Sequence, residues 1–425
     1  MSKFVRLNHT FTNNPGASTI AFSVLLFLPF AFVYIYAGGL PFSLDVSFAS
    51  DEPIYHYPTI LKFAEQLPFP DIRDYNSATT PLFHLVFAVV SKIIGTDIRG
   101  LRFFNVLISY VSLLILFKII INRFNLTKAN AFLLTFIFAC SPYYFREAFV
   151  VVTDNFPVLW LLCFFNYYFK YKEEHRQRFF ILSALFLLLL CLTRQTYLFV
   201  CIAVITDQLF EKITISQKLK NSLWVLLAAL PTFILFFIWK GLTPPSFARL
   251  HTGESVINIK LFLYGLSILG FYSLFIPAFN SYKMLLRKKS MLVLCWVILS
   301  WVILFLIPVT KAPKDFGYLW HIAGPLPKLA NSSLLFYALV PVGVITLLSM
   351  QKKEMSFLIL FLVGLFISEM PNKIIFQRYY DNSILLSLIF FSARYHESNK
   401  VDLYRHLILI GFFIVYFVIY VITYK

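Results

Sequence analysis

The chain has 425 residues, of which 59% are hydrophobic and 13% charged, and Phe alone accounts for 50 of them. Its mean hydropathy is +0.77, and apolar runs occur along its whole length. These features exclude a soluble globular protein and indicate a multi-spanning helical membrane protein. The net charge of +17 does not indicate a nucleic-acid partner, because Lys and Arg lie in short clusters between apolar runs. We expect these clusters to meet anionic lipid headgroups and phosphate-bearing substrates.

The cysteines are scattered and mostly lie inside apolar runs. Their spacing predicts neither a disulfide framework nor a metal site, so we interpret them as small core residues. They are Cys140, Cys163, Cys191, Cys201 and Cys295.

The first apolar run, residues 20–37, is long enough to cross a membrane. No small-residue cleavage site follows it, which favours an uncleaved first helix over a signal peptide. A first outer loop with interfacial helices is predicted over residues 38–102, and its first part carries Asp51, Glu52 and His56. A loop of this length inside a compact fold is usually functional.

Residues 81–94 are apolar, but about fourteen residues fall short of the ~20 needed to cross the hydrocarbon core. We therefore predict an interfacial helix within the first outer loop. With the N-terminus in the cytoplasm, this choice places every strong Lys/Arg cluster on the cytoplasmic side, as the positive-inside rule requires. A crossing helix at 81–94 would place all of them outside.

The later apolar runs predict twelve further spans, which with the first gives about 13 transmembrane helices in a range of about 11–14. No second domain is evident, so residues 1–425 are expected to form a single integral membrane domain, with a second long outer loop at 309–332. The predicted spans are 103–121, 129–145, 156–169, 179–191, 197–210, 222–240, 260–279, 291–308, 333–349, 355–370, 380–393 and 406–424.

Isolated polar residues gather in the predicted outer loops. A carboxylate such as Asp51, partly shielded from water at a membrane boundary, can act as a general base. The alternative is a solvated pair of acids, Asp51 and Glu52, with a structural histidine at His56. Asp154 is a second acid at the start of a predicted helix, where Thr153 or Asp154 could instead serve as the N-cap.

Arg194 and Gln195 interrupt a long apolar run. A guanidinium fork matches a pair of phosphate oxygens, and the alternative is an arginine that reaches the headgroups or pairs with an acid. Arg378 has a similar setting, with Asp381 as a competing structural partner.

Thr79 and Thr80 precede Pro81 at the start of the interfacial helix, where hydroxyl and N–H groups favour anions. Lys311, Lys314 and His321 are expected to be solvated residues of the second outer loop.

The sequence contains no Gly-rich phosphate loop, HExxH motif, serine-nucleophile elbow or Cys/His cluster. Nucleotide hydrolysis and zinc chemistry are therefore disfavoured. We predict no metal ligands and no required cofactor, and a divalent metal is left open.

The short polar motifs of the predicted outer loops, named at the end of this paragraph, resemble those of the GT-C class of membrane glycosyltransferases. Within that class they are similar to the alpha-1,2-glucosyltransferase family that uses dolichyl-phosphate-glucose to finish the lipid-linked oligosaccharide, over about the first half of the chain. A divergent relative with another sugar or acceptor is an open alternative. The motifs are Asp51-Glu52 with His56-x-Pro58, Thr79-Thr80-Pro81, Thr153-Asp154, Arg194-Gln195-Thr196 and, more faintly, Gly253-Glu254-Ser255.

The resemblance implies an all-α GT-C-like bundle and a hexosyltransferase of the EC 2.4 class. It would move a sugar, glucose as the first expectation, from a polyprenyl- or dolichyl-phosphate donor to a glycan or lipid-linked acceptor on the non-cytoplasmic face, with inversion. Asp51 would accept the proton of the acceptor hydroxyl, while Arg194 and Arg378 hold the leaving phosphate.

The remaining motif residues have assisting roles in this picture. Glu52, His56 and Asp154 would orient the acceptor or support the base, and Gln195 and Thr80 would add contacts to the donor phosphate. The expected location is the endoplasmic reticulum or a bacterial inner membrane, with a cytoplasmic N-terminus and a lumenal or periplasmic active site.

Two alternatives are a transporter or flippase of lipid-linked sugars and a glycan polymerase or ligase. A transporter usually places its polar residues near the midplane on broken helices, often within an inverted repeat. Here the informative polar residues gather at one face, and no repeat is evident. The acidic pair of the first outer loop argues only modestly against a polymerase or ligase.

Overall fold

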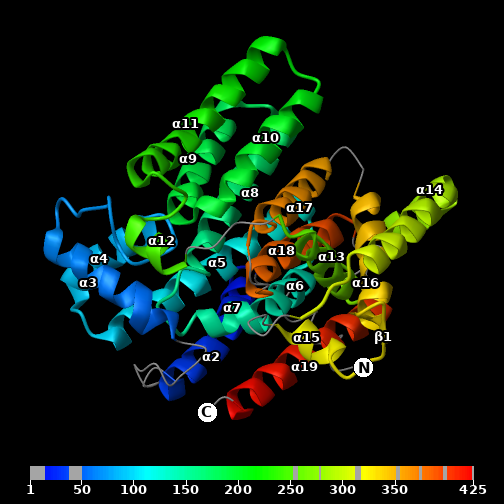
Figure 1. The fold of residues 1–425 in the computed structure, drawn as a ribbon, viewed down its shortest axis with the longest axis horizontal. Helices are drawn as coiled ribbons and strands as arrows, with labels where there is room; N and C mark the ends of the chain where they lie inside the picture. Colours follow the sequence, from blue (N-terminus) through cyan, green and yellow to red (C-terminus); the bar gives the residue numbers. More distant parts are fainter. Residues whose placement is uncertain are drawn as a thin grey trace.

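The computed structural model describes residues 15–37, 50–251, 257–276, 279–311, 317–350, 355–372, 376–395 and 400–423. Within these ranges the chain is almost entirely helical, and its strands form one short antiparallel hairpin, β1 (Lys328–Leu329) and β2 (Ser332–Ser333) (Figure 1). The predicted all-α fold is confirmed.

The N-terminal half begins with a long helix, continues through short elements of the first outer loop and then runs back and forth in longer helices. In order these are α2 (Pro15–Ala37), η1 (Glu52–His56), α3 (Tyr57–Gln66), α4 (Leu82–Ile94), α5 (Ile98–Phe124), α6 (Lys128–Cys140), α7 (Pro142–Glu147), α8 (Phe156–Glu174), α9 (Gln177–Thr193), η2 (Gln195–Tyr197), α10 (Leu198–Phe210) and α11 (Ile215–Trp239). The C-terminal half contains α12 (Pro245–His251), α13 (Ile259–Ser273), α14 (Phe279–Leu306), α15 (Tyr318–Ala323), α16 (Leu334–Ser349), α17 (Ser356–Glu369), α18 (Arg378–Arg394) and α19 (Lys400–Thr423).

A helix occupies every predicted span, and local residue chemistry sets the boundaries. Asp97 caps α5 by accepting a hydrogen bond from the backbone N–H of Arg99, and α5 ends where Asn125 adopts a left-handed conformation. The span predicted over 129–145 is divided in two, because Ser141 precedes a proline and takes an extended conformation. The second of these two helices, α7, ends beside the site described below.

Five of the described helices are long and apolar enough to cross a membrane, at Ser18–Ile35, Ile98–Phe124, Ile215–Trp239, Ser281–Leu306 and Asp402–Ile419. Shorter apolar helices of 10–17 residues accompany them, and α4 is one of these. With 13 residues, α4 is about 20 Å long, less than the ~30 Å hydrocarbon core. The helices support a multi-pass membrane protein.

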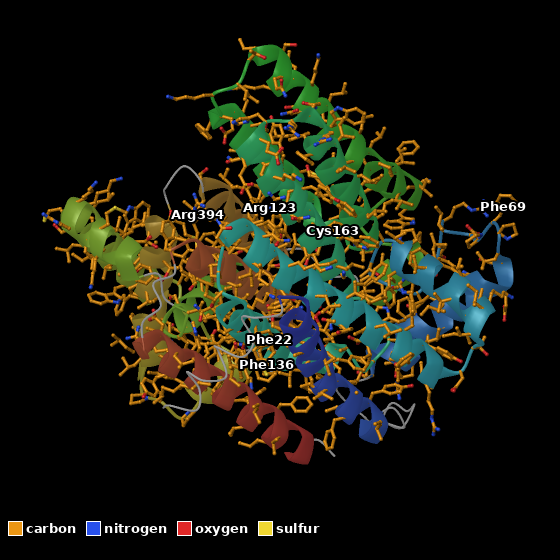
Figure 2. All side chains as sticks on the ribbon, turned by 180° about the vertical axis from the view of Figure 1, so that it is seen from behind. Phe22, Phe69, Arg123, Phe136, Cys163 and Arg394 are labelled. Atoms are coloured by element: carbon orange, nitrogen blue, oxygen red, sulfur yellow. The ribbon has the colours of Figure 1, made fainter. Side chains whose placement is uncertain are left out.

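Phenylalanine rings fill much of the space between helices. Phe22 of α2 lies 5.0 Å from the ring centroid of Phe132 in α6, which in turn stacks on Phe136 (Figure 2). By contrast, Phe69 in the α3–α4 connection is 89% exposed and stands at the edge of the molecule.

The helices α13 and α16 pack closely against each other through glycine. A Cβ on Gly270 would lie 2.0 Å from the carbonyl oxygen of Leu339, and one on Gly343 would lie 2.1 Å from that of Leu266. Only glycine fits at either position, and small residues of this kind allow helix backbones to approach closely in membrane proteins.

The links predicted to be cytoplasmic bond to one another. Arg123 in the last turn of α5 donates to Glu173 of α8 at 2.8 Å, and Lys172 of α8 donates to Asp207 of α10 at 2.7 Å. The α10–α11 link lies at the top of Figure 1, whereas α7 and α12 lie far below it. The predicted outer segments therefore meet in a different region of the molecule.

Candidate active site

Two ion pairs lie at the meeting point of the predicted outer segments. Arg378, the first residue of α18, donates from Nη2 to Oδ2 of Asp51 just before η1, at 2.8 Å. Arg194, between α9 and η2, donates from Nη1 to Oδ1 of Asp154 at 3.1 Å. We call these four residues the four-charge cluster.

The two ion pairs share their surroundings. The guanidinium carbons of Arg194 and Arg378 lie 5.1 Å and 5.5 Å from the centroid of the Tyr379 ring, so both cations face one aromatic side chain. Burial raises the pKa of Asp154, but Arg194 and then Arg378 outweigh it and hold this pKa at about 2. Asp154 is therefore ionised at neutral pH and responds to both arginines.

His56 lies beside the cluster and is held neutral. Burial lowers its pKa to about 4, and the charges of Asp51, Asp154, Arg378 and Arg194 all act on the same imidazole. Its Nδ1 lies 3.1 Å from Nε2 of His84 in α4, whose pKa burial also lowers. At neutral pH the two rings share one hydrogen bond without a positive charge.

Exposure differs among the carboxylates of this region. The side chain of Asp51 is 32% exposed, against 8% for Asp154 and 0% for Glu52. The guanidinium-bearing side chains of Arg194 and Arg378 are 19% and 18% exposed. Asp51 is thus the carboxylate that a ligand can reach most easily, with both arginines partly accessible.

Glu52 has a different role from its neighbour. It forms a fully buried ion pair with Arg102 of α5 and accepts a hydrogen bond from the backbone N–H of Val151 at 2.7 Å. The interpretation of Asp51 and Glu52 as a solvated pair of acids is wrong, because Glu52 is enclosed. The contact instead fixes η1, and with it Asp51, against α5 and the segment before α8.

Asp154 is not the N-cap of α8. That position is taken by Asn155, which makes no side-chain capping bond, and instead donates to Ser109 and to the carbonyl of Tyr144. The capping interpretation of Thr153 or Asp154 is therefore wrong. The helix start is held by buried amide contacts, which leaves Asp154 to face Arg194.

Gln195 and Thr80 hold the Arg194 kink in place. The backbone N–H of Thr80 donates to Oε1 of Gln195 at 3.2 Å, and its hydroxyl donates to the carbonyl of Cys191 at 2.9 Å. Gln195 also donates to the carbonyls of Ala78 and Leu242. These polar groups connect the start of α4 to the end of α9, so the structure places them behind the arginine.

Asp381 does not compete for Arg378. It accepts hydrogen bonds from Ser141 at 2.6 Å and from Tyr272 and Tyr318. The expected structural pairing of Arg378 with Asp381 is wrong, because Asp381 lies one turn further along α18 and faces other helices.

Four residues near the cluster were not predicted from the sequence as site residues: Arg102, His84, Glu147 and Tyr379. Glu147 ends α7 as a buried carboxylate paired with Arg146. Burial raises its pKa, with Asp154 acting in the same direction and Arg146 and Arg378 opposing. An ionisable residue inside or beside an apolar run was the only signal available for Arg102 and His84.

Other expectations fall elsewhere. Gly253, Glu254, Ser255 and Lys314 lie outside the described residues, while Lys311 and His321 are exposed. The cysteines are free thiols, with Cys191 and Cys201 buried and Cys295 exposed. Within the described ranges, no three His, Cys, Asp or Glu side chains are grouped closely enough to hold a metal ion.

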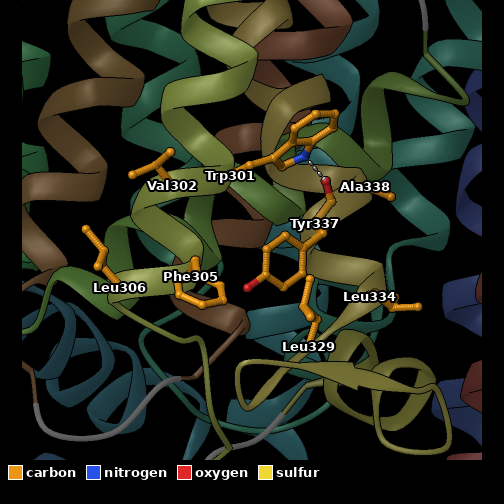
Figure 3. A pocket seen from close by; sticks show the side chains of 8 residues that line it. All are labelled: Trp301, Val302, Phe305, Leu306, Leu329, Leu334, Tyr337 and Ala338. Atoms are coloured by element: carbon orange, nitrogen blue, oxygen red, sulfur yellow. Dashed lines mark hydrogen bonds between the residues drawn. The ribbon is translucent and has the colours of Figure 1, made fainter.

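A groove of about 590 Å³ lies elsewhere, between α14, α16 and the β1–β2 hairpin. Figure 3 shows the rings of Phe305 and Tyr337 facing into it, with Trp301 donating to the backbone carbonyl of Tyr337 at 2.8 Å. None of its eight lining residues is charged, so this groove lacks the groups that recognise a phosphate.

Residues 78–239 match the sequence family described as dolichyl-phosphate-mannose-protein mannosyltransferase. The match runs from the residues just before α4 to the end of α11 and covers less than half of the chain; it includes Thr80, Asp154 and Arg194 but not Asp51 or Arg378. No curated protein and no solved structure matches the chain significantly. The family match, together with the apolar helices, supports a glycosyltransferase of the GT-C type in a multi-pass membrane protein.

Proposed function

We propose that the chain transfers a hexose from a polyprenyl-phosphate donor to a hydroxyl of a glycan or lipid-linked acceptor on the non-cytoplasmic face, with inversion. The observation that carries this proposal is the four-charge cluster, in which the accessible carboxylate of Asp51 pairs with Arg378 and a second arginine, Arg194, pairs with Asp154. The resemblance favours glucose and the matched family's name contains mannose, so the sugar is taken as a hexose.

The arginines are suited to a phosphate that leaves. Departure of a polyprenyl phosphate turns a phosphodiester with one negative charge into a phosphomonoester that develops a second. Guanidinium groups in a partly buried site stabilise such developing charge more strongly than they would in water. Nε of Arg378 is buried without a hydrogen-bond partner among the described residues, so this side chain retains a donor beyond its bond to Asp51.

Asp51 is suited to be the base. As the acceptor hydroxyl oxygen forms its bond to the anomeric carbon, the bond from that carbon to the phosphate oxygen breaks and the hydroxyl proton passes to Asp51. A donor phosphate that engages Arg378 competes with Asp51 for this guanidinium, which frees the carboxylate to accept the proton. The resting ion pair thus keeps both groups in position until the donor arrives.

The remaining residues are assigned supporting roles. Glu52 fixes η1 through Arg102, His56 packs as a neutral ring beside the cluster, and Asp154 orients Arg194. We reassign Gln195 and Thr80 from phosphate contacts to positioning of the Arg194 kink, because their hydrogen bonds are made to each other and to the backbone.

The test uses the purified protein in detergent with polyprenyl-phosphate glucose and polyprenyl-phosphate mannose, each with and without candidate acceptors. Consumption of one donor, with release of polyprenyl phosphate, supports the transferase. The alternative of a transporter or flippase predicts that activity is seen only in sealed vesicles and that the donor is chemically unchanged. The second result would contradict the proposal.

A further inference from the structure

A buried polar junction lies one helical turn beyond Arg378, and the proposed reaction does not account for it. Its centre is the carboxylate of Asp381, which is fully buried. Oδ2 accepts from the hydroxyl of Ser141 at the start of α7, and Oδ1 accepts from the hydroxyls of Tyr272 in α13 and Tyr318 in α15. One carboxylate therefore joins α7, α13, α15 and α18.

Gln377 extends the junction toward the second outer loop. Its Nε2 lies 3.5 Å from Oδ1 of Asp381, and its Oε1 accepts from the backbone N–H of Leu319 and from the hydroxyl of Tyr264 at 3.1 Å and 3.2 Å. Because Asp381 faces the amide nitrogen, the amide oxygen is directed at the start of α15. The first turn of α15 is thereby held against the residue that precedes Arg378.

The backbone at this contact leaves no space for rearrangement. Gly317 has a φ of +151°, and a Cβ there would lie 2.6 Å from both Cβ and Oε1 of Gln377. Only glycine can adopt this conformation at this distance from Gln377. The segment of the second outer loop at Gly317 is consequently seated directly on the start of α18.

Burying a carboxylate is costly unless hydrogen bonds compensate for it, and a buried polar network whose groups are satisfied rigidifies the structure and specifies one arrangement. Two of the helices joined by Asp381, α18 and α7, connect the junction to the four-charge cluster. Arg378 lies three residues before Asp381 on α18, and α7, which begins after Ser141, ends at Glu147 beside the cluster.

We propose that Asp381 is a positioning residue for the four-charge cluster: its bonds to Ser141, Tyr272 and Tyr318 fix the first turn of α18 so that Arg378 meets Asp51, and they tie the second outer loop to that turn. In its catalytic consequence this inference rests on the proposed transferase function. The positional part stands on the hydrogen bonds alone and can be tested without activity.

The positional test places cysteines at positions 51 and 378 in a background in which Cys140, Cys163 and Cys295 are replaced by serine, and it measures cross-linking by a short bifunctional thiol reagent. These variants lack the ion pair, so cross-linking reports how the two backbones lie. Asp381→Asn is expected to reduce cross-linking severalfold. The matched control is Ser387→Ala on the same helix, and it should leave cross-linking unchanged. Among the described residues the Ser387 hydroxyl bonds only to the carbonyl of Ser383, at 2.8 Å.

The catalytic test follows donor kinetics in the chain with its native cluster. Asp381→Asn should raise the donor KM and lower kcat/KM by roughly 10- to 100-fold, because small displacements of a binding group have effects of that size. If Asp381→Asn only reduced the amount of folded protein, the fraction of active enzyme would fall and the donor KM would stay unchanged. Ser141→Ala removes one hydrogen bond to Asp381, and Tyr318→Phe removes the hydroxyl that contacts both Asp381 and Tyr272. Each should give a smaller loss of about 3- to 10-fold, even if Asp381→Asn folds poorly.

Two results would overturn the inference. The first is that Asp381→Asn leaves cross-linking unchanged, and the second is that Ser387→Ala reduces cross-linking as much as Asp381→Asn does. Absence of transfer by the unmodified chain would contradict the proposed function instead. In that case the cross-linking result still decides whether Asp381 positions Arg378.

Discussion

Nη2 of Arg378 lies 2.8 Å from Oδ2 of Asp51, although 327 positions separate the two residues in the sequence. The contact joins the segment after the first membrane helix to the start of α18, near the opposite end of the chain. Beside it, Arg194 and Asp154 form a second pair that shares the Tyr379 ring. Four charges drawn from four separate segments thus form one site in a chain that is only 13% charged.

Replacing either arginine of the cluster should affect the chemical step. For Arg194→Gln and Arg378→Gln we expect kcat to fall by roughly 10²- to 10³-fold, the effect of removing one preorganised donor from a developing negative charge. Arg→Lys should restore only part of the rate, because an ammonium group does not reproduce the planar fork. The exposed Arg73→Gln variant, which loses only the surface pair with Asp71, is the control and should retain full activity in the same transfer assay.

The neutral histidine pair predicts how stability depends on pH. The folded-state pKa of His56 is about 4, and that of His84 is also lowered. Below about pH 6.5 these two histidines therefore bind more protons in the unfolded chain than in the folded chain. Stability should therefore decrease as the pH falls from about 6.5 toward 4, with a contribution of about 3 kcal/mol from His56 when its titration is complete. Asp154, with a pKa of about 2, stays ionised over this range.

The thermal midpoint in detergent, measured from pH 7 to pH 4.5, checks this expectation. A His56→Gln variant keeps a polar group next to His84 but cannot become protonated, so its midpoint should decrease less steeply with falling pH than that of the unmodified chain. Identical slopes for the two proteins would show that His56 is not held neutral by burial.

The Glu52–Arg102 pair should matter for stability more than for chemistry. Both side chains are fully buried, and removing one partner of such a pair leaves an uncompensated charge at a cost of about 3–5 kcal/mol. Arg102→Met alone should therefore lower the thermal midpoint strongly. The double variant with Glu52→Gln, which removes both charges, should recover much of the loss; no recovery would argue against a direct pairing.

The orientation predicted by the basic clusters can be tested with single cysteines at positions 71 and 175. Asp71 belongs to the first outer loop and has a side chain that is 38% exposed, while His175 lies in the exposed α8–α9 link among basic residues. With all five native cysteines replaced by serine, a membrane-impermeant thiol reagent should label position 71 from the non-cytoplasmic side and position 175 from the cytoplasmic side. Labelling of both from one side would refute this orientation.

The helices could be predicted because each is specified by an apolar run that is local in the sequence. The structure has a helix at every predicted span. Ser141 was the exception: the proline that follows it ends α6 early. The charged members of the site could also be proposed from sequence, since ionisable residues beside membrane segments are costly and seldom incidental.

The partners of these residues could not be predicted, because each pairing joins distant segments. Arg378 was expected to have Asp381 as its competing acid, three residues away, yet it bonds to Asp51. Arg102 falls at the end of the predicted first outer loop and His84 within the predicted interfacial helix, and neither position indicates that these residues support Glu52 and His56. Thr80 and Gln195 were placed correctly near Arg194, but their role as backbone contacts is visible only once α4 and α9 are seen together.

Turnover by Asp51→Asn is the measurement that tests the central claim most directly. The variant keeps the size of the side chain and a hydrogen-bond acceptor for Arg378 but cannot accept the proton of the acceptor hydroxyl. Asp71→Asn, which removes an exposed acid of the same outer loop, is the matched control. We predict that Asp51→Asn binds the polyprenyl-phosphate sugar but transfers none of it, while Asp71→Asn remains fully active; transfer by Asp51→Asn at the unmodified rate would contradict the assignment.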